Sequence, residues 1–466
     1  MKIVSNTPEY EKDLLELARL FYPINSESYE DVSINHTYEK LNDSTMQNSF
    51  EITTPEGAFD YKKTSNTAEN SINFRKTIQI ALYEALKDHL KVDMPWGALI
   101  GIRPVKMARD LVQNGLSMVS LKNHLKNNYY VSDEKADLLI EIIENQGKLE
   151  QNDKLIDIYI NIPFCVTRCN YCSFISAEIG KCKSLIEPYI DALIDEIKDT
   201  REIIGKRSYV VKTIYIGGGT PTSFSAEQLE RILKELQFGV KEFTVEAGRP
   251  DTITKEKLDV FKKYGVTRIS INPQSFNEKV LEKANRNYTI KEFLDVYKLA
   301  LNYNFIINMD LILGLDGETL KSFKSGVETL LELAPENITL HTLALKRSST
   351  LNKDKVNIFK PSKVKNMLEY GYKRLKESGY KPYYLYRQKN MVENLENVGF
   401  SYGKINCIFN IDSIEENTNI ISCGAGGVSK RVFLIENRHE LLPNAKGIKE
   451  YIERIDEIKK KKAKLF

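Results

Sequence analysis

Three cysteines crowd into eight residues, and their spacing could hold an iron–sulfur cluster. Cys165, Cys169 and Cys172 follow the pattern C-x3-C-x2-C directly after an apolar, β-rich run. Iron–sulfur clusters take thiolate ligands from short loops. Three protein ligands leave the fourth iron of a 4Fe–4S cube open to a small chelating molecule, and Tyr171 would shield the cluster from water. We therefore predict that these three cysteines are the metal ligands.

A zinc site and a set of buried free thiols are the alternatives to the cluster. Structural zinc sites use four protein ligands and pair two C-x2-C units over a longer span. No second pair exists, and the histidines are remote in sequence: His36, His89, His124, His341 and His439. The other cysteines are scattered, and we interpret them as structural: Cys182, Cys407 and Cys423.

The elements that position this loop follow from a change in pattern at Lys154. Short β-rich runs then alternate with amphipathic runs about six times, which predicts parallel strands joined by right-handed crossovers. The expected strands are 155–160, 210–216, 242–246, 268–271, 307–311 and 338–343. The expected helices are 185–200, 226–236, 255–264, 291–302 and 320–333. A partial (β/α)6 TIM-like barrel or a doubly wound sheet fits this alternation, and both bind ligands at the carboxyl ends of the strands.

The flanking segments differ from this alternation. Residues 1–150 combine alternating, strand-like runs within 36–65 with a periodic helix near 72–90, and a polar linker follows at 146–153. After 346 the sequence suggests helices at 362–378 and 447–462 and an extended aromatic run at 380–387. We predict an α/β protein with an N-terminal α+β domain (1–150), a partial barrel (151–345) and a mostly helical C-terminal domain (346–466) packed on the barrel.

Polar residues gather where the expected strands end. The second strand ends in GGGTPT (217–222), whose glycines let the backbone approach a ligand closely. Glu246 ends the third strand and could face a ligand ammonium. Asp310 lies within an apolar run, where ribose hydroxyls would satisfy a carboxylate that is costly to bury alone. Arg286 precedes a helix and could meet a carboxylate.

Taken together, these motifs resemble the radical S-adenosylmethionine (SAM) superfamily, and within it the oxygen-independent coproporphyrinogen III oxidase family. The motifs are YINIPFC (159–165), GGGTPT, the Glu246 strand, PQSF (273–276), Asn285-Arg286 and NMDLILGL (308–315). The stretches 383–391, 396–399 and 101–104 resemble the coproporphyrinogen dehydrogenase (HemZ) type.

The resemblance implies cofactors, roles and a reaction. SAM would chelate the open iron, and one electron would split it into methionine and a 5′-deoxyadenosyl radical. Tyr159 would be catalytic near the cluster. The implied cofactor-binding residues are Gly218, Gly219, Thr220, Glu246, Gln274, Arg286 and Asp310. Two propionates of coproporphyrinogen III would become vinyl groups, giving protoporphyrinogen IX, with an electron donor such as flavodoxin or ferredoxin.

Several assignments stay open at this level. Two roles fit each of the following cations, which could anchor a substrate carboxylate or be ordinary surface charges: Arg249, Arg347, Arg387 and Lys389. The aromatic residues Tyr383, Tyr384 and Tyr386 could stack on the substrate or pack in the core. His341 lies near the expected pocket and is a candidate for substrate contact. The family also contains haem chaperones, and another radical SAM reaction on a tetrapyrrole is a further alternative. Oligomeric state is not readable.

Composition excludes other classes of function. The net charge of +3 over 466 residues gives no case for nucleic acid. The sequence contains no run of about 18 apolar residues, so we expect no membrane span. The first residues lack a signal-peptide pattern, and we therefore expect a cytoplasmic protein. The basic run at 459–464 suggests a solvated tail.

Overall fold

The computed structural model describes residues 1–22, 30–66, 74–101, 103–172, 174, 176–344, 362–389, 391–436 and 438–466. Ile102, Arg347 and Asn390, which the sequence motifs include, lie outside these residues. The chain forms two compact units. Unit 1 comprises Met1–Glu141 and Arg387–Glu396, and unit 2 comprises Ile142–Tyr386 and Asn397–Phe466. The three-domain boundaries expected from the sequence stay a prediction.

Unit 1 is built on a four-stranded sheet in the order β1-β2-β3-β4. Its strands are β1 (Lys2–Ser5), β2 (Ser33–Lys40), β3 (Thr45–Thr54) and β4 (Gly57–Asn66). Its helices are α1 (Glu11–Phe21), α3 (Phe74–Leu90), α4 (Pro104–Gln113), α5 (Met118–Tyr129) and most of α6 (Asp133–Gln146). Buried residues alternate along β3, and β2, β3 and β4 pair antiparallel, as the alternating sequence predicted.

A late segment of the chain completes unit 1. Trp96 donates its indole N–H to a carboxylate oxygen of Glu396 at 2.7 Å, and Lys135 forms an ion pair with the same carboxylate. Arg387 donates to the Leu99 carbonyl, and its guanidinium lies 5.1 Å from the centre of the Trp96 ring. Residues near 96 and 396 therefore share one buried polar cluster.

Unit 2 is an open, curved α/β sheet of eleven strands. The strand order is β13-β14-β12-β11-β10-β9-β8-β5-β15-β16-β17. The six strands expected from the sequence are β5 (Leu155–Ile162), β8 (Val210–Gly218), β9 (Glu242–Gly248), β10 (Arg268–Ile271), β11 (Ile306–Leu313) and β12 (Asn337–Thr342). All six run parallel, as predicted, and no closed barrel forms among the described strands.

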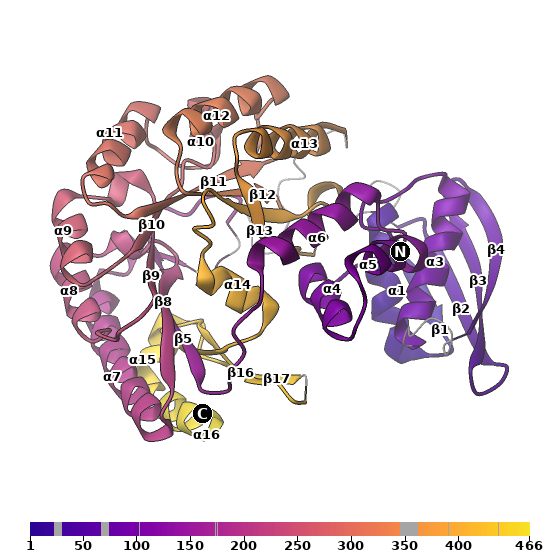
Figure 1. The fold of residues 1–466 in the computed structure, drawn as a ribbon, viewed down its shortest axis with the longest axis horizontal. Coiled ribbons are helices and arrows are strands. Elements are labelled where there is room, and N and C mark those ends of the chain that lie inside the picture. Colours follow the sequence, from indigo (N-terminus) through magenta and orange to yellow (C-terminus); the bar gives the residue numbers. More distant parts are fainter. Residues whose placement is uncertain are drawn as a thin grey trace. The chain divides into compact units, whose positions relative to one another are not determined.

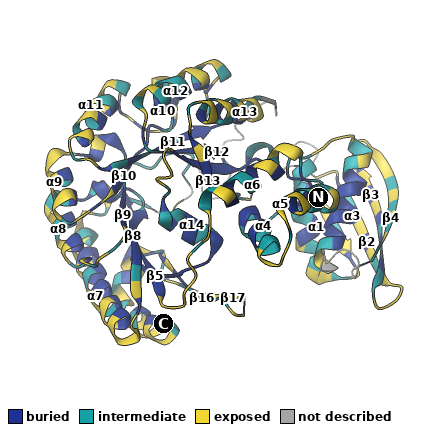
Figure 2. Cartoon of the chain, in the orientation of Figure 1, coloured by how far each residue is buried: buried dark blue, intermediate teal, exposed yellow. Residues whose placement is uncertain are grey.

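Helices cover the outer side of these parallel strands (Figure 1). They are α7 (Lys183–Arg207), α8 (Ala226–Lys234), α9 (Lys255–Lys263), α10 (Glu278–Lys283), α11 (Ile290–Leu301) and α12 (Leu320–Leu333). Side-chain capping boxes begin α8, α11 and α12 and satisfy backbone N–H groups there. The strands are buried on both faces, while the helices keep exposed outer faces (Figure 2). The partial barrel therefore presents the carboxyl ends of its strands at one edge.

The C-terminal segment extends both edges of the sheet, which the sequence pattern did not predict beyond the aromatic run. Its strands are β13 (Lys381–Tyr386), β14 (Asn397–Ser401), β15 (Asn419–Cys423), β16 (Val428–Phe433) and β17 (Arg438–Pro443). Its helices are α13 (Ser362–Glu377), α14 (Ile408–Glu415), α15 (Ile448–Glu453) and α16 (Ile455–Leu465). β15 pairs parallel with β5 and so continues the barrel wall.

The expectation of a solvated basic tail is wrong, because that run lies in α16. Lys462 is completely buried and pairs with Glu196 of α7 at 2.6 Å. Its ammonium also donates to the Ser422 carbonyl at 2.7 Å and lies 3.5 Å from the Cys423 sulfur. Lys459 pairs with Asp195 at 2.7 Å. One face of the basic run therefore packs on the barrel.

Candidate active site

The predicted cluster loop begins where β5 ends. Cys165 is buried in the short strand β6 (Phe164–Cys165), whereas Cys169 and Cys172 are partly exposed in the turn that follows. Burial, together with a smaller effect of the two other thiols, raises the pKa of Cys172 to about 11. No three acidic, histidine or cysteine side chains among the described residues converge on a single metal ion. An iron–sulfur cluster takes each thiolate on a different iron, so its ligands need not converge on one point.

Backbone and side-chain hydrogen bonds join this loop to the segment before α11. The Asn170 amide donates to the Lys283 carbonyl at 2.5 Å, and the Asn285 amide donates to the Arg168 carbonyl at 2.8 Å. The Thr167 hydroxyl donates to the Asn285 carbonyl at 3.2 Å. Asn285 itself has a φ of +60°, a conformation that asparagine tolerates better than most residues. The segment 283–285 therefore holds the loop at residues on both sides of Cys169.

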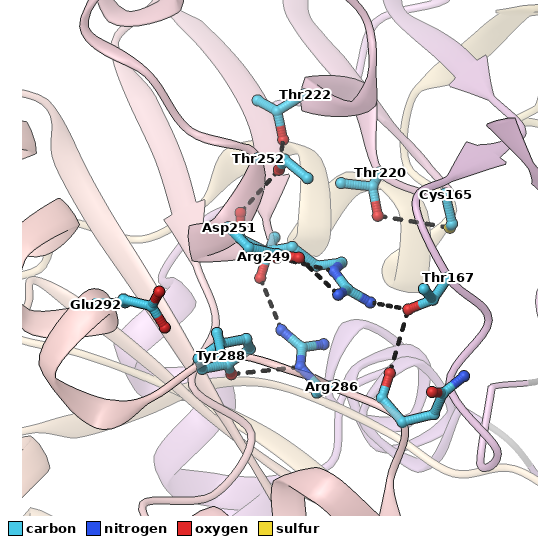
Figure 3. Close-up of polar contacts among 12 residues, drawn as sticks. Cys165, Thr167, Thr220, Thr222, Arg249, Asp251, Thr252, Arg286, Tyr288 and Glu292 are labelled. Atoms are coloured by element: carbon cyan, nitrogen blue, oxygen red, sulfur yellow. Dashed lines mark hydrogen bonds and ion pairs between the residues drawn. The ribbon is translucent and has the colours of Figure 1, made fainter. Parts of the chain in front are cut away.

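Arg249 fixes the same loop from the end of β9. Its guanidinium donates to both Asp251 oxygens, at 3.0 and 2.7 Å, and to the Thr167 hydroxyl at 2.8 Å (Figure 3). Arg249 is 3% exposed. Its fork is thus paired within the chain, and the structure gives it a positioning role in place of the carboxylate-anchoring role considered from the sequence.

Arg286 is also held by protein groups. Its guanidinium donates to the carbonyls of Gly248 and Asn272, at 3.1 and 2.9 Å, and to the hydroxyls of Tyr171 and Tyr288, at 3.2 and 3.3 Å. Figure 3 shows the contact with Tyr288. Tyr171 precedes the last predicted cluster ligand. Arg286 therefore links the ends of β9 and β10 to the cluster loop, and a SAM contact through it stays a prediction.

The glycine-rich turn after β8 presses against the cluster loop. A Cβ atom on Gly219 would lie 2.5 Å from the Phe164 carbonyl oxygen and 3.0 Å from the Cys165 sulfur, so only glycine fits there. The Thr220 N–H donates to the Phe164 carbonyl at 2.7 Å. Its hydroxyl donates to the Cys165 sulfur at 3.5 Å (Figure 3). Thr220 thus faces the cluster ligand, whereas Gly218, with a φ of +111°, turns the backbone beside Ile162.

Glu246 lies at the end of β9, facing the barrel interior. Burial raises the pKa of its carboxyl group to about 7, while hydrogen bonds from Tyr215 and the Gly218 backbone act in the opposite direction. The Tyr215 hydroxyl donates to the carboxyl group at 2.5 Å. A Cβ on Gly217 would lie 2.9 Å from the same group. The carboxyl group is therefore close enough to the glycine turn to share a ligand with it.

Gln274 and Asn272 carry polar atoms that lack partners. Gln274 has a φ of +63°, and its backbone bridges to β11. The buried side-chain oxygens of Gln274 and Asn272 accept no hydrogen bond from any described residue. Such groups are costly to bury unless a ligand satisfies them, and strained backbone often accompanies functional sites. These two oxygens are the strongest structural indication of a ligand in the barrel.

Asp310 is not the unpartnered carboxylate that the apolar run suggested. The side-chain amides of Asn272 and Asn308 donate to it at 2.7 and 2.8 Å, and the Nε2 atom of His341 lies 3.5 Å away. Sequence reasoning missed the two asparagines. Asn308 could have been found, because it stands two positions before Asp310 in one β-run, which puts both side chains on one face. Asn272 follows a different strand, β10, and its contact with Asp310 depends on the fold.

Tyr159 lies in an aromatic stack within the barrel. Its ring centre is 6.1 Å from that of Tyr215 and 5.8 Å from that of Phe409. Its hydroxyl donates to the Asn161 amide oxygen at 3.1 Å, and burial raises the pKa of its phenol. Asn161 in turn donates to the Ala425 carbonyl, an interaction that the sequence did not suggest. The catalytic assignment of Tyr159 stays a prediction.

The remaining candidates for substrate contacts are mostly paired. Within unit 1, Arg387 bonds Leu99 and Asn394, and Lys389 pairs with Glu16. Tyr383 and Tyr384 are buried in the barrel core, in agreement with the packing alternative. Arg249, Arg387 and Lys389 each have polar or charged partners within their own unit.

Comparison with known proteins assigns the class. Residues 159–330 match the model of the radical SAM superfamily. The solved structure of coproporphyrinogen III oxidase (HemN) from Escherichia coli shares the fold, with a TM-score of 0.52 and 22% identity, covering 69% of this chain and 72% of that one. The chain is therefore a radical SAM protein, and a 4Fe–4S cluster and SAM are the cofactors of that class.

Longer matches narrow the family. The chain is 39% identical over 403 residues to the oxygen-independent coproporphyrinogen-III oxidase-like protein HemZ of Bacillus subtilis, covering 84% of this chain and 80% of that protein. It belongs to this HemZ family. It is also 37% identical to the haem chaperone HemW of Bacillus subtilis, over 40% of this chain and 49% of that protein. None of the helices that the structure describes combines the length and hydrophobicity needed to cross a bilayer.

The residues present fit both cofactors. Three thiols share one loop. Burial favours the protonated forms of Cys165 and Cys172, so the thiolates need a positive charge that bound iron would supply. The unpartnered oxygens of Gln274 and Asn272 and the close glycine turn fit a polar ligand beside the cluster. SAM contacts by individual residues stay proposals.

Proposed function

We propose that this protein catalyses the oxygen-independent oxidative decarboxylation of coproporphyrinogen III to protoporphyrinogen IX. The observation that carries the proposal is the match to the coproporphyrinogen-III oxidase-like protein HemZ over 84% of the chain. The arrangement of polar groups at the strand ends is consistent with it, because the cluster loop, the glycine turn and Glu246 lie together.

The chain's own residues hold and shield the reacting groups. When bound, the reduced cluster and SAM supply a 5′-deoxyadenosyl radical. Cys165, Cys169 and Cys172 would ligate three irons, and Gly218, Gly219 and Thr220 would place the backbone beside the methionine end of SAM. Glu246, Gln274, Arg286 and Asp310 would orient SAM from the ends of β9, β10 and β11. The buried aromatic stack around Tyr159 excludes water from the barrel.

At the substrate, the β-carbon of a propionate side chain would lose a hydrogen atom to the 5′-deoxyadenosyl radical, giving 5′-deoxyadenosine and a substrate radical. Loss of carbon dioxide and one electron then gives a vinyl group, and the same sequence follows at a second propionate. An external one-electron acceptor must take each electron, and a reductant such as flavodoxin or ferredoxin must reduce the cluster.

The test is an anaerobic incubation of reconstituted protein with SAM, reductant, an electron acceptor and coproporphyrinogen III. Mass spectrometry should detect the loss of two carboxyl groups as carbon dioxide, together with 5′-deoxyadenosine. Protein with all three cluster cysteines replaced by Ala is the control and should make neither product. Cleavage of SAM with all four propionates retained would refute the proposed substrate.

A haem carrier is a second candidate, because several relatives named haem chaperone HemW match 40–49% of the chain, with identities of 27–37%. Titration of the protein with haem would then give a stoichiometric absorbance change. The same preparation would give no product from coproporphyrinogen III.

A further inference from the structure

Three side chains from three segments of the barrel form one chain of polar contacts. The Tyr386 hydroxyl lies 3.3 Å from Nδ1 of His341, and Nε2 of His341 lies 3.5 Å from Oδ2 of Asp310. The rings of His341 and Tyr386 meet edge to face, with centres 6.3 Å apart. Both imidazole nitrogens therefore face specific partners.

The fold holds these three residues in place. Asp310 and His341 lie on the neighbouring parallel strands β11 and β12, and Tyr386 ends β13. The Asp310 carboxylate is fixed by Asn272 and Asn308. The side chains of His341 and Asp310 are 24% and 16% exposed. The chain of three is thus anchored at Asp310 and open enough at His341 to meet a ligand.

Hydrogen-bond accounting gives this chain two states. When His341 is neutral, the Asp310 carboxylate favours a proton on Nε2, so Nδ1 accepts the Tyr386 proton. When His341 is protonated, both ring nitrogens donate, and the Tyr386 oxygen becomes the acceptor. The Tyr386 O–H is then directed away from His341 and donates to another group. Protonating one imidazole therefore changes what Tyr386 offers a ligand.

We propose that His341 and Tyr386 form a subsite for a carboxylate of the tetrapyrrole, with Asp310 fixing the orientation of His341. This inference rests on the proposed function, whose substrate carries four propionates. A carboxylate would accept the Tyr386 O–H beside the positive imidazolium, which is a charge-assisted arrangement. Arg249, the other cation considered in this unit, does not supply such a site, because its guanidinium is paired with Asp251.

The proposal requires proton uptake on binding, since the carboxylate stabilises protonated His341. Among the described residues, the charged and titratable groups that face His341 are Asp310 on β11, Glu246 on β9 and the Tyr386 phenol on β13, with Tyr384 next to Tyr386. Glu246 also interacts electrostatically with Asp310 and His341, and burial raises the pKa of its carboxyl group to about 7, so it can contribute to proton uptake. Its contribution must be separated experimentally.

The experiment is anaerobic isothermal titration calorimetry of cluster-loaded protein with coproporphyrinogen III, without SAM, near pH 7. Two buffers of different ionisation enthalpy give the number of protons taken up. His341→Gln keeps a donor toward Asp310 but cannot be protonated, and Tyr386→Phe removes only the hydroxyl. Tyr402→Phe, at a residue 55% exposed in the same unit, is the matched control. Circular dichroism checks that each variant is folded.

Wild-type protein and Tyr402→Phe should bind with proton uptake. His341→Gln should lose that uptake, and Tyr386→Phe should bind roughly tenfold more weakly. In a Glu246→Gln background, the part of the uptake that depends on His341 should persist. Equal affinity and equal uptake in wild type, His341→Gln and Tyr386→Phe would overturn the subsite while leaving the proposed substrate intact. No binding to the wild-type protein would instead refute the proposed function, and the subsite with it.

Discussion

Replacing Lys462 by Met would remove the cation from a fully buried ion pair. Lys462 and Glu196 are both 0% exposed, and Glu196 also accepts hydrogen bonds from Asn444 at 2.9 Å, from the Tyr451 hydroxyl at 2.5 Å and from the Gly424 N–H at 2.7 Å. Methionine fills a similar volume without charge. The variant therefore leaves a buried carboxylate with neutral donors only.

The size of the penalty follows from the two ways in which Glu196 can respond. Leaving one partner of a buried pair uncompensated costs about 3–5 kcal/mol. The carboxyl group can instead bind a proton, and since a glutamic acid in an unfolded chain titrates near 4.3, this costs about 4 kcal/mol at pH 7 and about 2 kcal/mol at pH 5.5. We therefore expect Lys462→Met to lower the free energy of unfolding of unit 2 by about 3–4 kcal/mol at pH 7. The penalty should fall as the pH falls, because the folded variant holds a proton that the unfolded chain releases.

Urea unfolding followed by far-ultraviolet circular dichroism at pH 7 and 5.5 measures this penalty. Trp96 is the single tryptophan and lies in unit 1, so its fluorescence reports that unit separately. The double variant Lys462→Met/Glu196→Gln removes both charges and should recover stability to within about 1 kcal/mol of wild type. A penalty below about 1 kcal/mol, one that does not depend on pH, or one that the second substitution fails to relieve would refute this reasoning.

Three further predictions concern the site and its core. Thr220→Val should lower the reduction potential of the reconstituted cluster, because it removes a hydrogen bond to the Cys165 sulfur. Thr220→Ser keeps the hydroxyl and should leave the potential unchanged. A redox titration followed by electron paramagnetic resonance measures both potentials. Burial raises the pKa of Glu246 to about 7, so its stabilising contribution is present below about pH 4.5 and is lost as the pH rises through 7. Glu246→Gln should abolish this pH dependence of the free energy of unfolding, which is on the order of 3 kcal/mol and is measured by urea unfolding. An unchanged pH dependence in the variant would count against this assignment. Gly399→Ala should destabilise the protein by about 1–3 kcal/mol in thermal unfolding, because its Cβ would lie 1.8 Å from the Tyr384 ring, and wild-type stability would contradict that contact.

The barrel was predictable because its strands are short apolar runs separated by amphipathic helices. Each run is buried on both faces, so its hydrophobicity alone marks it, as in β5. The same logic missed β15, whose pairing partner β5 lies more than 250 residues earlier and whose surroundings show no alternation. The basic run of α16 was misread because nothing near Lys462 in sequence reveals Glu196.

The site was predictable in its residue types and less so in their partners. The cysteine spacing and the glycine turn are local patterns, and the structure places them against each other. The arginines are different, because a sequence shows a cation but not what neutralises it. Arg249 is paired with Asp251 only two residues away, yet its contact with Thr167 depends on the fold. The His341–Asp310 contact likewise requires the register between two strands.

The late segment that completes unit 1 has a consequence for biosynthesis. Glu396, the partner of the Trp96 indole, leaves the ribosome about 300 residues after it, which is on the order of 15–60 s at ordinary rates of translation. During that interval the N-terminal unit lacks Arg387–Glu396, and most of the barrel emerges before it is finished. A chain truncated near residue 141 would lack the 387–396 segment permanently. The N-terminal unit should therefore be produced only with that segment attached through a linker.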